Sequence, residues 1–406
     1  MSPFGGHQAS LGRGLFHTVH YTASSSSDLR LLINGHKGMR RVYIYEVQER
    51  ADFDFYSPFS NMIFFPRLSS TTALQLLFSL AQAQAPTKVG AAVVFGAGGT
   101  YPRATKLADG SLLGVYTHFD NGNNTLTTVK STDNGASWTP LGVIDTAPST
   151  ARDLDNGYVH QLPNGNIVAS FRNHDKVNGK YTFYRITVCG SSDGGKSWKF
   201  LSQAAEDPAG PNGNWEPFFQ TALDGSLQIY YSRENAANDQ DSLLRRSTDG
   251  GATWTSAQVI SGQGITARDG MLGVARIAAN SATKLAIFES GAPGFTVHTV
   301  RSGDDGATWG DRALVYEARG KNAGAPQIER VGGRLVASFG TNEDAGDWPV
   351  GALKVMVSSD GGRTWGYKTT VHDSPAMWAG LLALDDRRFL ALYESGGTSY
   401  AQKLTF

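Results

Sequence analysis

Polar side chains recur at two positions of a repeating strand pattern, and their types suit the binding and cleavage of a sugar. Arg, Asn and Asp can bond hydroxyl groups, Trp offers a ring face, and a pair of carboxyl groups can break a glycosidic bond. The first position, at the start of the first strand of each repeat, holds Arg103, Asp155, Asn156, Glu216, Arg268, Asp269, Gln327 and Trp378. The second, at the end of the second strand, holds His118, Asp120, Arg172, Asn173, His174, Arg233, Glu234, Asn235, Glu289, Asn342, Glu343, Asp344 and Glu394.

The repeat itself is marked by the pattern Ser-x-Asp-x-Gly-x-[Ser/Thr]-Trp. It occurs at residues 131–138, 191–198, 247–254, 302–309 and 358–365, so successive copies are 60, 56, 55 and 56 residues apart. A fixed period of this length indicates a repeat architecture. Asp and Gly favour a tight turn, and strand-like runs flank each copy, so the pattern is predicted to be a hairpin turn covered by its Trp.

A second hairpin signature, two apolar residues around an Asp, Asn or Gly turn, fills the rest of each period. Its copies lie at 107–112, 162–167, 223–227, 278–285, 331–335 and 384–389. Two hairpins give four strands for each period, which is the content of a propeller blade. The predicted fold is therefore all-β, a six-bladed β-propeller with four-stranded antiparallel blades. The last segment is short, and a strand near residues 89–95 is expected to complete it and close the ring.

Strand direction separates the turns from the polar set. In an antiparallel blade, the five turns between the third and fourth strands lie on one face of the propeller, and they are predicted to be structural. The start of the first strand and the end of the second strand lie on the opposite face, around the channel. The polar residues are therefore expected to surround the channel mouth.

Composition narrows the possible functions. The 36 Lys and Arg balance the 36 Asp and Glu, so neither a nucleic-acid surface nor a basic membrane surface is indicated. The nine His show no metal-ligand spacing, and no metal or cofactor is expected. Cys189 is the single cysteine, which excludes an intrachain disulfide and predicts a buried, inert thiol.

Residues 62–85 read as a secretory signal sequence. Arg67 precedes an apolar stretch that ends in small residues, and the stretch is too short and polar to be a convincing membrane span. We therefore expect a secreted, extracellular protein. Residues 1–61 are expected to be an artefact of a misplaced start codon, with Met62 as the true start, or else a genuine extension. Residues 86–406 form the predicted catalytic propeller.

The turn patterns are identified as the Asp-box, or BNR, repeats of sialidases and other propeller hydrolases. Within that group, residues of about 95–406 resemble the fungal family 93 glycoside hydrolases, the exo-α-1,5-L-arabinanases. The segments that carry the resemblance include YPRAT, DNGYVHQLPNGNIVASFRNH, NGNWEPFFQ, YYSREN, TARDGMLGV, NAGAPQ and WAGLLALD.

The resemblance implies a retaining enzyme that releases arabinobiose from the non-reducing end of linear arabinan. It implies Glu216 as the acid/base and Glu289 as the nucleophile, with carboxyl groups about 5–5.5 Å apart. The neighbouring Trp215 is expected to raise the pKa of Glu216 by desolvation. Expected substrate contacts are Arg103, Asp155, Asn156, Arg172, Asn173, His174, Trp215, Arg233, Asp269, Gln327 and Trp378. The expected partner is arabinan or an arabino-oligosaccharide, bound by a monomer.

Several alternatives remain open from the sequence. Glu394, in a motif like that of Glu289, and Glu234 are alternative second carboxylates, and Asp269 could form an ion pair with Arg268. A sialidase is a second possible function, since Arg103 fills the place of the first Arg of its triad. However, YPRAT differs from the usual Phe-Arg-Ile-Pro, and two further Arg are not evident. A non-catalytic, sugar- or protein-binding propeller is the third.

Overall fold

The computed structural model describes residues 28–36, 39–47, 84–210, 213–291 and 294–406. The chain divides into two units, Met1–Leu80 and Ala81–Phe406. In the first unit, β1 (Asp28–His36) pairs antiparallel with β2 (Met39–Val47). The predicted signal sequence lies outside the described residues except for residues 84–85, so the N-terminal boundaries stay predictions.

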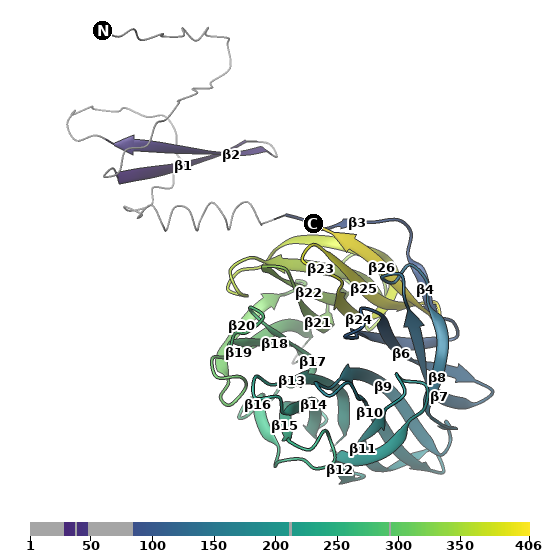
Figure 1. Ribbon diagram of the computed structural model, residues 1–406. Helices are drawn as coiled ribbons and strands as arrows, with labels where there is room; N and C mark the ends of the chain where they lie inside the picture. Colours follow the sequence, from purple (N-terminus) through teal and green to yellow (C-terminus); the bar gives the residue numbers. More distant parts are fainter. Residues whose placement is uncertain (1–27, 37–38, 48–83, 211–212, 292–293) are drawn as a thin grey trace, which may run out of the picture. The chain divides into compact units, whose positions relative to one another are not determined.

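The second unit is a ring of antiparallel sheets around a centre, as Figure 1 shows. The first sheet is β5 (Gly99–Lys106), β6 (Leu112–Asp120), β7 (Asn123–Ser131) and β8 (Thr139–Pro148), and the second is β9 (Arg152–Gln161), β10 (Ile167–Val177), β11 (Lys180–Ser191) and β12 (Lys199–Pro208). The third is β13 (Asn214–Thr221), β14 (Leu227–Ala236), β15 (Asp239–Ser247) and β16 (Gln258–Ser261), and the fourth is β17 (Arg268–Arg276), β18 (Lys284–Gly291), β19 (Phe295–Ser302) and β20 (Gly310–Tyr316). The fifth and sixth use β21 (Ala323–Val331), β22 (Arg334–Thr341), β23 (Gly351–Ser358), β24 (Gly366–Ala383), β25 (Arg388–Ser395) and β26 (Thr398–Thr405).

The ring closes through its inner strands and through the last sheet. Each inner strand packs on the next in the order β5, β9, β13, β17, β21, β24, and β24 packs on β5. The long strand β24 pairs with β23 in its first half and with β25 in its second, so it serves two sheets. β26 pairs with β3 (Thr87–Lys88) and β4 (Val93–Gly96). This pairing is the closure predicted for residues 89–95, and it leaves β26 without an open edge there.

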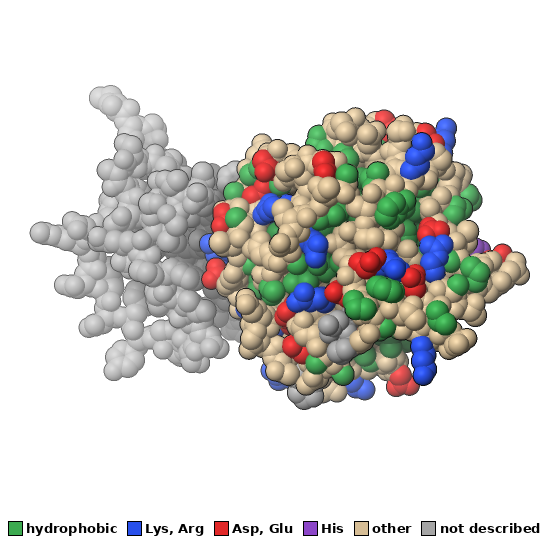
Figure 2. Space-filling model, turned by 90° about the horizontal axis from the view of Figure 1, so that it is seen from below, with side chains coloured by type: hydrophobic (Ala, Val, Ile, Leu, Met, Phe, Trp, Pro, Cys, Tyr) green, Lys and Arg blue, Asp and Glu red, His purple; other side chains and the backbone are tan. Residues whose placement is uncertain are grey.

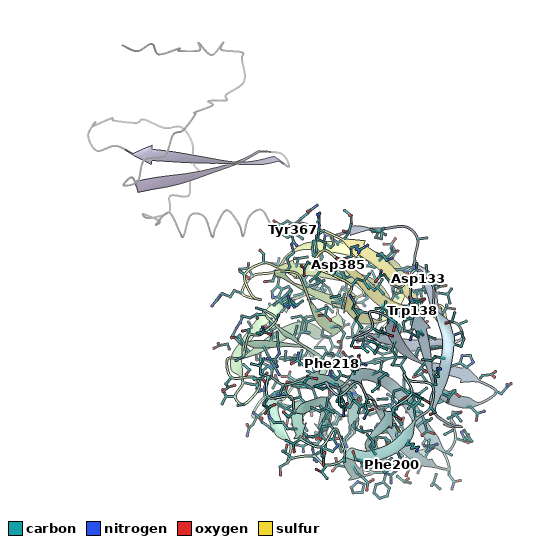
Figure 3. The ribbon with its side chains drawn as sticks, in the orientation of Figure 1. Asp133, Trp138, Phe200, Phe218, Tyr367 and Asp385 are labelled. Atoms are coloured by element: carbon teal, nitrogen blue, oxygen red, sulfur yellow. The ribbon has the colours of Figure 1, made fainter. Side chains whose placement is uncertain are left out.

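The Asp-box turns are structural, as predicted. In the first, Asp133 accepts bonds from the Ser131 and Ser137 hydroxyls at 2.7 and 2.6 Å and from backbone amides, while Trp138 packs on Phe95 (Figure 3). Equivalent bonds tie the other four boxes. Each turn joins the third strand of a sheet to the fourth, so the acids that stand out in the sequence serve turn geometry.

The core lies mainly between neighbouring sheets. Val115 and Leu126 of the first sheet pack with Val159 and Phe171 of the second, and similar clusters follow around the ring. Cys189 is buried in that cluster, and burial raises the pKa of its thiol to about 12, in accord with an inert thiol. Acidic and basic side chains are interspersed on the face seen in Figure 2. Within the described residues, no helix has the length and hydropathy of a membrane span.

Candidate active site

All six inner strands carry the same backbone irregularity at the same place. In each, two residues stand opposite one residue of the second strand, which is a β-bulge. The first bulged residue has a positive φ, between 48° and 59°, although none of these residues is glycine. They are Tyr101, Asn156, Glu216, Met271, Ala325 and Trp378. A strained conformation repeated six times marks this level of the channel as a candidate site.

The bulged residues meet near the axis of the ring. Tyr101, Met271 and Ala325, from the first, fourth and fifth sheets, form one buried cluster with Trp378 packed against it. Tyr101 and Trp378 have ring centroids 6.3 Å apart. Glu216 raises the pKa of Tyr101 by its charge, so the carboxyl lies near the same cluster. Glu216 is the one acid among the six bulged residues.

A second layer of side chains fills the channel two residues further along each inner strand. Arg103, Tyr158, Phe218 and Gln327 occupy it, and Tyr158 and Phe218 have ring centroids 4.5 Å apart. Figure 3 labels Phe218 close to the centre of the ring. At the same level, a Cβ on Gly380 would lie 3.1 Å from Arg103 Nη1. The channel is therefore packed at this level, and the layer supports the residues at the bulges.

Glu216 has the surroundings of a carboxyl group that keeps its proton. Burial raises its pKa to about 8, and the charge of Glu289 is the next largest cause. The charges of Arg172 and Arg268 and a hydrogen bond from Ser232 oppose the rise. Among the described residues, its Oε2 is buried without a hydrogen-bond partner. A neutral carboxylic acid that keeps one oxygen unbonded can donate a proton to a ligand.

Glu289 lies on β18, opposite the residue that precedes the bulge at Met271. Its Oε2 accepts a bond of 2.6 Å from the backbone N–H of Ala325, the bulged residue of the next sheet. Burial raises its pKa to about 7, against the opposing effects of that bond and of Arg268. The bond from Ala325 favours the ionised form of Glu289, whereas Glu216 Oε2 has no hydrogen-bond partner among the described residues. This difference agrees with the predicted roles, which stay predictions.

The other two candidate carboxylates have different partners. Glu234 pairs with Arg268 at 2.6 Å. Glu394 takes the position in the sixth sheet that Glu289 takes in the fourth, but its Oε1 accepts the N–H of Gly397 in its own hairpin. Glu289 is the carboxylate with the largest effect on Glu216. The geometry therefore favours Glu289 over Glu234 and Glu394.

A second group of predicted residues surrounds Trp215, beside Glu216. Arg172 Nη2 bonds Asp155 at 3.2 Å and Asp153 at 3.2 Å, and its guanidinium lies 5.0 Å from the Trp215 ring. His174 packs edge-on against that ring at 4.7 Å and bonds the carbonyl of Asn214 through Nε2. His174 is fully buried, and desolvation lowers its pKa to about 3. Asp155, Arg172 and Trp215 therefore lie together, with His174 supporting the indole.

Other predicted contact residues are placed in the framework. Asp269 was expected at the substrate, but it is fully buried and bonded to Arg312 and Ser261. It does not pair with Arg268 either, because Arg268 bonds Glu234. Asn173 points to the opposite side of its strand from Arg172 and bonds Thr187. These two residues support the sheets rather than a ligand.

Four further predicted residues lie at the bulges or in the layer beside them. Arg103 is buried and donates to the carbonyls of Pro102 and Trp378. Gln327 is buried and bonds the carbonyl of Leu272 in the neighbouring sheet at 3.3 Å. Asn156 and Trp378 are bulged residues of the ring. Arg233 pairs in register with Asn214, and its charge partly opposes the rise that burial causes in the pKa of Asp241.

The structure adds site residues that were not predicted. Arg268 lies near both Glu216 and Glu289, because its charge lowers the pKa of each. Ser232 bonds Glu216 and also accepts the N–H of Met271. Arg268 belongs to the polar residues at the starts of the first strands, so the sequence pattern could have indicated it as a site residue. No sequence pattern indicates Ser232 or the backbone N–H of Ala325.

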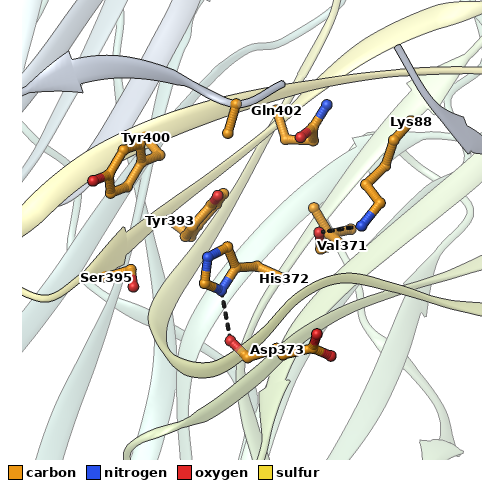
Figure 4. Close-up of a pocket in the computed structure, with 9 residues that line it drawn as sticks. Lys88, Val371, His372, Asp373, Tyr393, Ser395, Tyr400 and Gln402 are labelled. Atoms are coloured by element: carbon orange, nitrogen blue, oxygen red, sulfur yellow. Dashed lines mark hydrogen bonds between the residues drawn. The ribbon is translucent and has the colours of Figure 1, made fainter. Parts of the chain in front are cut away.

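A separate hollow of about 390 Å³ lies at the outer part of the sixth sheet, lined by residues such as Lys88, His372, Tyr393 and Tyr400 (Figure 4). Lys88 Nζ bonds the carbonyl of Val371, and His372 bonds that of Asp373. The hollow holds no pair of carboxylates and is distinct from the axial site. Across the residues that the structure describes, no cluster of His, Cys, Asp or Glu could hold a metal ion.

Glu216 should make stability depend on pH. Its pKa is raised by folding, so the folded state holds a proton that the unfolded state releases, and stability falls as pH rises from about 4.5 to about 8. We expect Glu216→Gln to abolish this part of the loss. The variant should unfold at a higher temperature than the wild type at pH 8, with little difference at pH 4.5. Thermal unfolding between these pH values, with the exposed Glu317→Gln as control, tests this; equal curves at all pH values would contradict it.

The fold and site define a class: an Asp-box propeller with a half-buried carboxyl pair near its axis. The family model described as a BNR repeat-like domain matches residues 120–400, and the chain belongs to this family. No curated protein sequence matches the chain.

Solved structures share the fold. The GH93 α-L-arabinofuranosidase of Fusarium graminearum, solved with arabinobiose, has 20% identity and a TM-score of 0.61 over 79% of this chain and 97% of that one. The Penicillium chrysogenum α-L-arabinanase, also solved with arabinobiose, has 18% identity and a TM-score of 0.62 over 79% and 98%. The NanB sialidase from Streptococcus pneumoniae has 11% identity and a TM-score of 0.53 over 84% and 73%. The predicted propeller and its BNR repeats are thus confirmed.

Proposed function

We propose that the protein is a glycoside hydrolase that acts on arabinan. The observation that carries this proposal is the half-buried pair of Glu216 and Glu289, in which each carboxyl has a raised pKa and the charge of Glu289 raises the pKa of Glu216. Such a pair supplies a proton donor and a carboxylate on one substrate. The two similar structures bound to arabinobiose support arabinan as the substrate class.

In the finer form of the proposal, the enzyme is retaining and acts from the non-reducing end. Glu289 attacks the anomeric carbon, and Glu216 gives its proton to the leaving oxygen and then activates water as a base. Arg268 lies near both carboxyls, where its charge stabilises the ionised forms. In this proposal, Asp155 and Arg172, which lie beside Trp215, bond sugar hydroxyls.

The assay is direct. We expect the purified full-length chain to release arabinobiose from linear arabinan as its first product, with the configuration retained in the initial NMR spectrum. Glu216→Gln, prepared in parallel, excludes a contaminating hydrolase. Longer oligosaccharides as first products would contradict exo action, and an inverted product would contradict Glu289 as nucleophile.

A sialoside belongs in the same assay, because a sialidase shares the fold. Sialidase chemistry needs a Tyr nucleophile beside a Glu, and Tyr101 lies near Glu216. Burial raises the pKa of Tyr101 well above its ordinary value, which disfavours the phenolate. We therefore expect no release of sialic acid.

We also propose that the protein is secreted, on the basis of the apolar segment 62–85. The N-terminal residue of protein recovered from the culture medium tests this. A mature terminus upstream of residue 62 would contradict it.

A further inference from the structure

An aromatic pair lies beside Glu289, on residues that the sequence patterns did not single out. Trp348 belongs to the segment between β22 and β23, and Phe295 is the first residue of β19. Their rings are nearly parallel, with centroids 5.6 Å apart and an interplanar angle of 28°. Both side chains are only half-buried. The pair comes from the fourth and fifth sheets, the two sheets that Glu289 connects.

Gly324 shows how close Trp348 is to the carboxyl group. A Cβ on Gly324 would lie within 3.0 Å of three atoms: Glu289 Oε2 and the indole carbons Cη2 and Cζ2 of Trp348. The benzo edge of the indole and the reactive carboxyl therefore border the same small space, which a residue without a side chain leaves open. Trp348 therefore lies next to the carboxyl oxygen of Glu289.

The backbone holds this aromatic pair in place. The N–H of Phe295 bonds Asn322 Oδ1 at 2.8 Å, and the N–H of Asn322 bonds Asn342 Oδ1 at 2.8 Å. Trp348 lies within a turn in which the N–H of Val350 bonds the carbonyl of Asp347 at 2.8 Å. An aromatic ring held by its backbone loses little entropy when a ligand packs on it.

We propose that Trp348, backed by Phe295, is a substrate-binding residue that packs against the sugar ring attacked by Glu289. The C–H groups of a pentose ring lie against the indole, while its hydroxyl groups bond polar side chains of the site. Trp348 thereby determines affinity for the sugar on the side of the scissile bond that forms the covalent intermediate. This inference rests on the proposed function.

The test compares Trp348→Ala and Trp348→Phe with Trp309→Phe in the full-length chain. Trp309 is a half-buried Asp-box Trp that donates to the carbonyl of Gly306 in its own turn and packs edge-on against Tyr230. We expect Trp348→Ala to raise KM for arabino-oligosaccharides roughly tenfold, with a smaller rise for Trp348→Phe and none for Trp309→Phe. In a Glu216→Gln background, in which turnover is greatly slowed, Trp348→Ala should weaken arabinobiose binding by a similar factor in calorimetry.

Tryptophan fluorescence gives a readout that a purely structural role would not change. Trp348→Phe should remove part of the sugar-induced signal, because Trp215 beside Glu216 also reports on the ligand, and Trp309→Phe should leave the signal unchanged. An active wild type whose KM, binding and fluorescence response survive Trp348→Ala would overturn this inference alone. A wild type without activity on arabinan would overturn the proposed function, and this inference with it.

Discussion

Replacing Glu216 by glutamine is expected to lower kcat/KM on arabino-oligosaccharides by roughly a thousandfold, because general acid catalysis contributes on the order of 10²–10⁴. Glutamine keeps the size of the side chain and cannot give a proton to the leaving oxygen. With an aryl arabinoside, whose phenolate leaves without a proton, the first step should stay fast and the loss should be much smaller. Steady-state and pre-steady-state rates on the two substrates check this.

Glu289→Gln should behave differently, because a better leaving group removes the need for a proton donor but not the need for a nucleophile. Its activity should fall on both substrates. Glu394→Gln is the matched control, since Glu394 takes the equivalent position in the sixth sheet but bonds its own hairpin. If Glu216→Gln lost activity on both substrates equally and Glu289→Gln kept activity on the aryl arabinoside, the roles of the two residues would be exchanged. Full activity of either variant would remove that residue from the mechanism.

Gly324→Ala should lower kcat by roughly a hundredfold through a single added methyl group. The new Cβ would collide with Glu289 Oε2 and with the indole of Trp348, so the carboxylate must move. The same movement breaks the 2.6 Å bond from the N–H of Ala325. A displacement of about 1 Å at a reacting group costs on the order of 10² in rate. Kinetics on oligosaccharides and a crystal structure of the variant would measure both effects.

Gly340→Ala provides a closely matched control. Gly340 pairs with Gly324 across β21 and β22, but a Cβ there would have its nearest contact at 3.8 Å. We expect this variant to keep nearly wild-type kcat and a similar unfolding temperature. If Gly324→Ala were equally active, Glu289 would have more freedom than the packing indicates, and its bond to Ala325 would not position it.

The fold could be predicted from the sequence because the information for it is local and repeated. The five boxes fix a turn, their spacing fixes the period, and a second hairpin signature gives the strand count. The closing strand was predicted because the last segment lacked strands, and β4 pairs with β26 accordingly. Strand direction then placed Glu216 and Glu289 on the same side of the propeller.

The finer arrangement of the site could not be predicted in this way. Tyr101 and Met271 adopt a positive φ that their side chains disfavour, so their bulges come from the packing of the ring and leave no local signal. Asp269 was predicted to contact the substrate, but its side chain is fully buried. Side chains alternate between the two faces of a strand, and the bulge that follows at Met271, which shifts this alternation, was not predicted. Trp348 lies between strands, where no periodic pattern indicates what it contacts.

The six bulges have a consequence for how chemistry can be distributed on this scaffold. The positive φ occurs whether the bulged residue is alanine, tyrosine or glutamate. The strain energy of this backbone conformation is therefore a property of the propeller fold and is not specific to Glu216. The scaffold therefore offers six equivalent backbone positions related by pseudo-rotational symmetry, and Glu216, the proposed proton donor, occupies one of them. In enzyme engineering, a catalytic side chain introduced at Ala325 or Met271 would therefore start from the same bulged backbone conformation as Glu216.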